Sequence, residues 1–192
     1  MKKRIAVFAS GTGSNTINII NYFSEHPSIE VSYILSNNKS APVLKSASDL
    51  GIISYYFDKK MIEDENGKVS EILDEIQPDI IVLAGFLWKF PSHLIQKHTN
   101  IINIHPALLP KYGGKGMYGA NVHRAVLDNK EKESGITIHR VNPIYDDGTI
   151  IFQERLQITP EDTIESLQQK IHALEHEHFP KVIEQLLEEN TH

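Results

Sequence analysis

Asn103 and His105 have the side chains best suited to chemistry, because they lie two residues apart in the β-branched run Ile101–His105. Side chains two apart on a strand point to the same side, so this amide and this imidazole would face one space. The amide N–H can stabilise a developing oxyanion, and the imidazole can move a proton to or from a reacting centre. The pair therefore suits acyl transfer, while a purely structural histidine at a strand end is the alternative.

Asp146 is a third candidate, in the polar segment 142–148. If the fold brings this carboxylate to His105, it would orient the imidazole and raise its pKa. The alternative is that Asp146 only belongs to an Asp-Asp-Gly turn between two strands. The sequence alone leaves both interpretations open.

A small-residue turn, Ser10-Gly11-Thr12-Gly13-Ser14-Asn15, stands between an expected strand and an expected helix. Backbone N–H groups and the positive end of a helix meet an anion at such a turn, so we predict a phosphate site there. We expect Gly13 to let the phosphate approach the backbone with no side chain in the way. The turn is not a dinucleotide fingerprint, because Thr16 replaces the third glycine, and it lacks the Gly-Lys-Ser/Thr of a P-loop. A plain turn capped by Ser14 or Asn15 is the alternative.

Two other segments carry weaker signals. His172, Glu175 and His176 match the H-x-x-E-H pattern of zinc peptidases, but 10 histidines in 192 residues make chance spacings common, so we expect no metal there. Segment 85–90 places bulky apolar groups at the end of an expected strand. A flat ring system of a ligand could pack against this segment, or the side chains of the segment could simply fill the core.

Periodic apolar patterns must build the scaffold that positions these side chains. Five β-branched runs bounded by turn residues predict strands at 4–9, 30–36, 52–57, 79–84 and 101–105. Helical patterns between them cover 14–25, 42–50, 68–76 and 91–97. The alternation predicts an α/β fold with a single doubly wound, mostly parallel, Rossmann-like sheet. Such sheets bind ligands beyond the carboxyl ends of their strands, where 10–15, 85–90 and 103–106 lie.

The second half of the chain differs from the first in composition and in its expected elements. Five glycine or proline residues between 110 and 119 predict a long loop, and a helix is expected at 120–128. Two strand-like stretches, 135–141 and 149–157, are expected to pair antiparallel. The chain then forms a long C-terminal helix, which we expect to be capped by Asp162 with Glu165 three residues on.

Composition and charge narrow the class of protein. The 192 residues, 40% apolar and 23% charged, are typical of a single globular domain, divided into a phosphate-binding half (1–105) and a half with the catalytic loop, strand pair and C-terminal helix (106–192). A net charge of −6 disfavours nucleic acid or an anionic membrane as partner. The run 80–88 is too short to span a bilayer, and the absence of cysteine excludes disulfides and thiolate chemistry. We expect a cytoplasmic monomer or homodimer that binds small molecules.

Nearly the whole chain resembles the monofunctional phosphoribosylglycinamide formyltransferases of purine biosynthesis. The motifs that carry the resemblance are Ser10-Gly11-Thr12-Gly13-Ser14-Asn15, Leu83-Ala84-Gly85-Phe86, Asn103-Ile104-His105-Pro106 with Leu108-Leu109-Pro110-Lys111-Tyr112, and Asp146-Asp147-Gly148-Thr149-Ile150-Ile151. Each motif is modest alone, but the four in this order are highly specific. The resemblance implies a formyl transfer from 10-formyltetrahydrofolate, as co-substrate, to the amino group of glycinamide ribonucleotide, without a metal.

The resemblance also implies roles for individual residues. The catalytic residues would be Asn103, His105 and Asp146. Glycinamide ribonucleotide would be held by Gly13, Ser14 and Asn15 at its phosphate and by Glu175 at its ribose. The folate would be bound by Leu87, Trp88, Lys89, Phe90, Asn103, Asn142, Pro143, Ile144 and Tyr145. The chain departs from the family at Trp88, where a basic residue is common, and it lacks an arginine sometimes found before the fourth strand.

Three other functions remain as alternatives. Formyltransferases that act on initiator methionyl-tRNA share the Asn, His and Asp chemistry, but they carry an added carboxyl-terminal domain that we do not expect in this acidic chain. Formyltetrahydrofolate hydrolases carry an added amino-terminal domain, which we also do not expect. A non-catalytic nucleotide-binding domain would be favoured if Asn103, His105 and Asp146 lay far apart.

Overall fold

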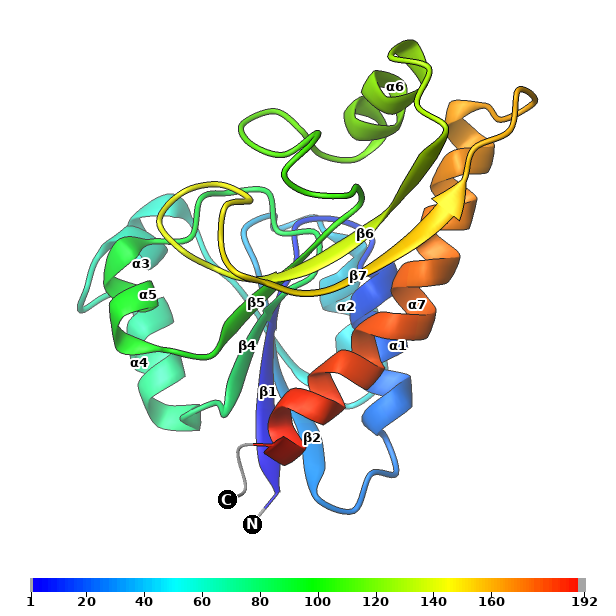
Figure 1. Cartoon of the computed structure of the whole chain (residues 1–192). Helices are drawn as coiled ribbons and strands as arrows, with labels where there is room; N and C mark the ends of the chain where they lie inside the picture. Colours follow the sequence, from blue (N-terminus) through cyan, green and yellow to red (C-terminus); the bar gives the residue numbers. More distant parts are fainter. Residues whose placement is uncertain (1, 190–192) are drawn as a thin grey trace.

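The fold is built on one seven-stranded sheet, seen in a computed structural model that describes residues 2–189 (Figure 1). Residues 1 and 190–192 of the predicted 1–192 domain lie outside the described part. The strand order is β3-β2-β1-β4-β5-β6-β7. The first five strands in this order pair in parallel, whereas β6 pairs antiparallel with β5 and β7 pairs antiparallel with β6. The strands are β1 (Lys3–Phe8), β2 (Ile29–Ser36), β3 (Ile53–Tyr56), β4 (Ile80–Leu83), β5 (Ile101–His105), β6 (Glu133–Arg140) and β7 (Ile150–Gln157).

Helices cover both faces of the sheet, as Figure 1 shows, with α1, α2 and α7 on one side and α3, α4 and α5 on the other. Alternate residues of β1 supply the two cores, since Ile5 and Val7 pack on the first side and Ala6 and Phe8 on the second. The helices are α1 (Ser14–Phe23), α2 (Pro42–Asp49), α3 (Lys59–Glu63), α4 (Lys68–Ile76), α5 (Ser92–Lys97), α6 (Ala120–Asp128) and α7 (Ile164–Glu189).

The order of the strands determines where in the fold a ligand can bind. After β3 the chain crosses back over β1 to form β4, so the sheet is wound in both directions from its centre. This switch point opens a crevice beyond the carboxyl ends of β1 and β4. Within residues 2–189, no helix is both long and apolar enough to cross a membrane.

The expected strands and helices are confirmed to within a few residues, including the antiparallel pairing of β6 and β7. Helix α3 was not predicted, because its five residues are too short for a periodic signal; the carboxylate of Asp58 caps it by accepting from the Met61 N–H at 2.9 Å. The predicted cap of the long helix was wrong. Thr163 and Ser166 exchange backbone-to-hydroxyl hydrogen bonds at its start, and Asp162 pairs with Lys170 instead.

Candidate active site

A cavity of about 550 Å³ opens at the switch point of the sheet. Segments that follow β1, β4 and β5 line it, together with the long loop 114–119 and one face of α7. The predicted site residues among its walls are Gly13, Ser14, Asn15, Leu87, Asn103, His105, Tyr145, Asp146 and Glu175. The fold therefore brings the three catalytic candidates and the four candidates for glycinamide ribonucleotide to one cavity.

Asn103 is held by a histidine that the sequence analysis missed. The β5–β6 register places His139 opposite Asn103, and the amide nitrogen lies 3.0 Å from His139 Nε2. His139 Nδ1 lies 2.8 Å from the Arg140 carbonyl oxygen. The consistent assignment has Nδ1–H donating to this carbonyl and Nε2 accepting from the amide. One amide N–H thus fixes the side chain, and the second is left to meet a ligand.

His105 is buried, with 3% of its surface exposed, and only one of its ring nitrogens can exchange a proton. Nε2–H donates to the Tyr112 carbonyl at 2.7 Å, so Nδ1 carries the lone pair. Nδ1 faces Asp146 Oδ2 at 3.7 Å, which is beyond direct hydrogen-bond distance. Burial lowers the pKa of His105 below its ordinary value, although Asp146 and the Tyr112 carbonyl both act to raise it. Asp146 therefore acts on His105 in the direction expected from the sequence, but the net shift of the pKa is downward because desolvation outweighs the attraction.

Asp146 lies between the two imidazoles. Its Oδ2 accepts from the Gly114 N–H at 2.8 Å, and its Oδ1 lies 3.7 Å from His139 Nε2. Burial raises the pKa of Asp146, but His139, His105 and the Gly114 N–H together outweigh it and hold the pKa below its ordinary value. Asp146 is thus a carboxylate that faces a neutral His105 and favours its protonation at Nδ1. The interpretation of Asp146 as a turn residue alone does not account for these contacts.

The small-residue turn precedes α1 as predicted, with Gly13 as N-cap in a left-handed conformation, φ 76°. Asn15 Nδ2 donates to Glu175 Oε2 at 2.8 Å, so a buried carboxylate from α7 orients the first turn of α1. Burial raises the pKa of Glu175, and the Asn15 hydrogen bond opposes this shift. A β-carbon on Gly13 would lie 2.2 Å from Val43 Cγ2, so the glycine is required by packing against α2. The expectation that Gly13 also lets a phosphate approach the backbone stays a prediction.

Gly13→Ala is expected to lower the free energy of unfolding by about 1–3 kcal/mol, because alanine must adopt a positive φ and displace Val43. Urea denaturation of the purified variant measures this loss. Gly11→Ala is the matched control, since a β-carbon there meets nothing within 4 Å and its φ lies outside the left-handed region. Equal losses in the two variants would mean that Val43 does not restrict the turn.

The residues predicted to bind folate are divided between two cavities. Leu87 lines the main cavity, whereas a second cavity of about 60 Å³ is lined by Trp88, Lys89, Phe90, Asn142 and Ile144. Asn103, Tyr145 and Asp146 line both, so the two spaces adjoin at the catalytic candidates. Pro143 lines neither. Phe90 is 3% exposed and packs edge-on against Phe8, so core burial accounts for much of its role.

Two histidines beyond the predicted set also reach the main cavity. His123 on α6 is buried, and this burial, together with His172 and His105, lowers its pKa to about 4. It is therefore neutral at physiological pH. His172 also lines the main cavity, and its ring stacks on that of His176 with centroids 6.3 Å apart. Among residues 2–189, the three side chains close enough to share a metal lie elsewhere, and none of them belongs to the H-x-x-E-H pattern.

The sequence and the fold match one family of enzymes. Residues 3–183 match the formyl transferase family. The chain is 35% identical to the phosphoribosylglycinamide formyltransferase of Bacillus subtilis, covering 96% of this chain and 95% of the relative. It is 38% identical to the chloroplastic enzyme of that name from Arabidopsis thaliana, covering 98% of this chain but only 66% of the relative.

Solved structures agree with these matches. The phosphoribosylglycinamide formyltransferase of Anaplasma phagocytophilum superposes with a TM-score of 0.89 at 34% identity, covering 98% of this chain and 88% of that one. The enzyme of the same name from Streptococcus pneumoniae gives a TM-score of 0.82 at 36% identity, covering 97% and 99%. By its sequence and its fold, the chain belongs to the formyl transferase family.

Proposed function

We propose that this protein transfers the formyl group of 10-formyltetrahydrofolate to the amino group of glycinamide ribonucleotide. The observation that carries the proposal is the single cavity in which Asn103, His105 and Asp146 meet the small-residue turn and Glu175. A phosphate bound at this turn and acyl transfer at Asn103 and His105 would together suit a phosphorylated amine as acceptor. The near-complete match to the enzyme of Bacillus subtilis supports the same activity.

The acceptor would bind along α1 and α7. The backbone N–H groups of Gly13, Ser14 and Asn15 stand at the positive end of α1, where they suit a phosphate dianion. Glu175 lines the same cavity from α7, and a carboxylate there can accept hydrogen bonds from ribose hydroxyls. This arrangement would present the amine at the opposite end of the nucleotide to Asn103 and His105.

In the proposed reaction the amine nitrogen attacks the formyl carbon directly, without a covalent enzyme intermediate. The formyl oxygen becomes negative and the amine positive as the new C–N bond forms. The free amide N–H of Asn103 would stabilise the oxygen, and His105 Nδ1 would take a proton from the amine. The bond from the formyl carbon to the folate nitrogen then breaks, and that nitrogen receives a proton. Asp146 favours the imidazolium that exists between these two proton transfers.

The folate ring system would bind where the main cavity adjoins the second one, which Trp88 and Tyr145 line. Ligand cavities usually measure about 300–1,000 Å³, so the adjoining space of about 60 Å³ is too small for a fused ring. Loop 142–147 forms one wall of this space, and Ile144 and Tyr145 are exposed on it. Binding of the pterin would therefore require this loop to move outward.

A formyl-transfer assay with the purified chain tests the proposal. Glycinamide ribonucleotide, initiator methionyl-tRNA and water are offered as alternative acceptors, with 10-formyltetrahydrofolate as donor. We expect formylation of the ribonucleotide, with the two substrates bound together in one complex. Activity on the tRNA alone, hydrolysis without an acceptor, or a trapped formyl-enzyme would each overturn the proposal.

A further inference from the structure

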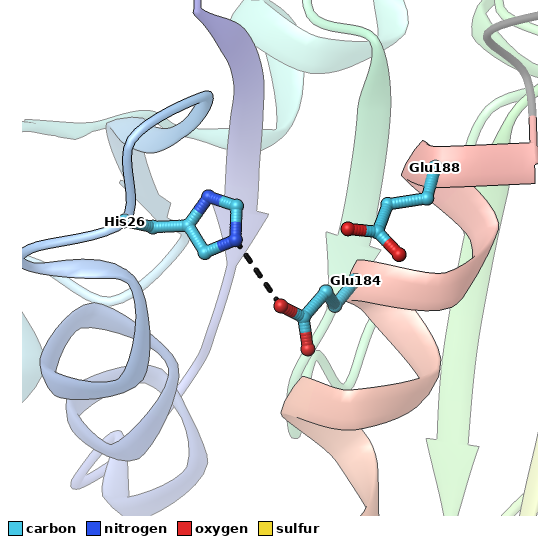
Figure 2. Close-up of side chains that lie close together, drawn as sticks. All are labelled: His26, Glu184 and Glu188. Carbon is cyan, nitrogen blue, oxygen red and sulfur yellow. Dashed lines mark hydrogen bonds and ion pairs between the residues drawn. The ribbon is translucent and has the colours of Figure 1, made fainter.

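Three potential metal ligands meet at the far end of α1 from the small-residue turn. His26 follows the end of α1, and Glu184 and Glu188 stand one helical turn apart near the end of α7 (Figure 2). One ligand atom from each of the three side chains lies within 4.8 Å of the others. The main cavity contains none of these residues, so the group is separate from the site described above.

We propose that His26, Glu184 and Glu188 bind one divalent transition-metal ion of the Zn²⁺ type. An imidazole favours Zn²⁺ and similar ions over Mg²⁺ and Ca²⁺, which prefer sites made of oxygen alone. Two carboxylates at i and i+4 project from one side of a helix and supply the charge that balances a dication. The site lies at the negative end of α7, which adds a further attraction for a cation. Three protein ligands leave a position for water.

The neighbouring groups are arranged to hold these ligands in place. His26 Nε2 lies 3.1 Å from Glu184 Oε1, and Tyr22 donates its hydroxyl to Glu184 Oε2 at 2.5 Å. The second carboxylate oxygen is thus fixed by Tyr22 while the first faces the imidazole, as in metal sites where outer hydrogen bonds orient a ligand.

A bound ion would replace the proton on His26 Nε2, and Nδ1 would then carry the ring proton. Nδ1 accepts from the Ser28 N–H at 3.4 Å, a long hydrogen bond that costs little to lose. Two lysines lie beside the group: Lys2 Nζ donates to the His26 carbonyl at 2.9 Å, and Lys3 Nζ donates to the Leu187 carbonyl on α7 at 2.6 Å. Because Lys2 binds the backbone of His26, its ammonium does not compete for the imidazole.

Metal binding here would fasten α1 to α7. These two helices already share the Asn15–Glu175 hydrogen bond and one from Asn18 Nδ2 to the His176 carbonyl at 2.8 Å. An ion that binds only the folded chain stabilises it by mass action. The site would therefore stabilise the helix pair that carries the small-residue turn and Glu175, without taking part in formyl transfer.

The test is a titration of the chelator-treated full chain with zinc chloride, followed by calorimetry and by thermal unfolding. We expect one ion per chain at this site and a rise in Tm. His26→Gln and Glu188→Gln should each weaken the binding by about tenfold or more. Glu188 is exposed, so its replacement leaves the fold intact. His178→Gln is the matched control, because His178 contacts Glu177 at 4.0 Å but belongs to no group of three potential ligands in the described part of the chain.

The outcomes separate this site from adventitious binding and from the proposed function. Unchanged zinc affinity in both His26→Gln and Glu188→Gln, or equal losses in His178→Gln, would overturn the proposal. Equal binding of Mg²⁺ or Ca²⁺ would overturn the assignment to a transition metal. Formyl transfer at 25 °C should be the same with zinc, with chelator and in both variants, so a failed activity assay would leave the metal result interpretable.

Discussion

Asn103→Ala is expected to lower kcat by about 10²–10³-fold, equivalent to about 3–4 kcal/mol, because it removes a fixed oxyanion donor. Asn103 is well placed for this effect, since one of its N–H groups is bound by His139 at 3.0 Å. The amide therefore needs no reorganisation when negative charge develops on the formyl oxygen. It carries no charge of its own, so the pH dependence of the rate should not move.

Steady-state kinetics over a range of pH measure both parts of this result. Asn142→Ala is a useful control, because Asn142 lines the second cavity and its loss should raise the KM for folate while kcat is retained. A variant Asn103→Ala that keeps most of the wild-type kcat would show that Asn103 only supports His139. A shift of the pH profile would mean that its loss changes the environment of His105.

Asp146→Asn is expected to lower kcat by about 10²–10⁴-fold, the range for loss of a group on which acid–base catalysis depends. The carboxylate lies 3.7 Å from His105 Nδ1, the one ring nitrogen that can exchange a proton. Asparagine tolerates the positive φ of 53° at this position, and its side-chain oxygen can still accept from the Gly114 N–H. The variant therefore removes charge with little change of structure.

The pH dependence gives a second test of Asp146. Asp146 raises the pKa of His105 against the larger lowering by burial, so without this carboxylate the pKa falls still further. The limb of the rate profile that reports His105 should move to lower pH in Asp146→Asn, as should the NMR titration of the imidazole. If neither the rate nor the profile changes, Asp146 is a turn residue and the assignment of the three catalytic residues is wrong.

The sequence by itself determined the strands, most of the helices and the edge of the sheet at which ligands bind. These features follow from local patterns, because apolar periodicity and turn residues act over a few positions. The spacing of Asn103 and His105 belongs to this class, since a strand alone puts both on one side. The four motifs together also determined the family to which the chain belongs.

Only the tertiary structure decided which residues from distant parts of the sequence support the candidate active site. His139 meets Asn103 across 36 positions because of the antiparallel β5–β6 register, which no local pattern encodes. The need for Gly13 comes from Val43 on another helix. The direction of the His105 pKa shift depends on how completely the packed chain removes water from the ring. Contacts between distant segments and loss of solvent arise only when the elements pack, and for that reason a single sequence could not show them.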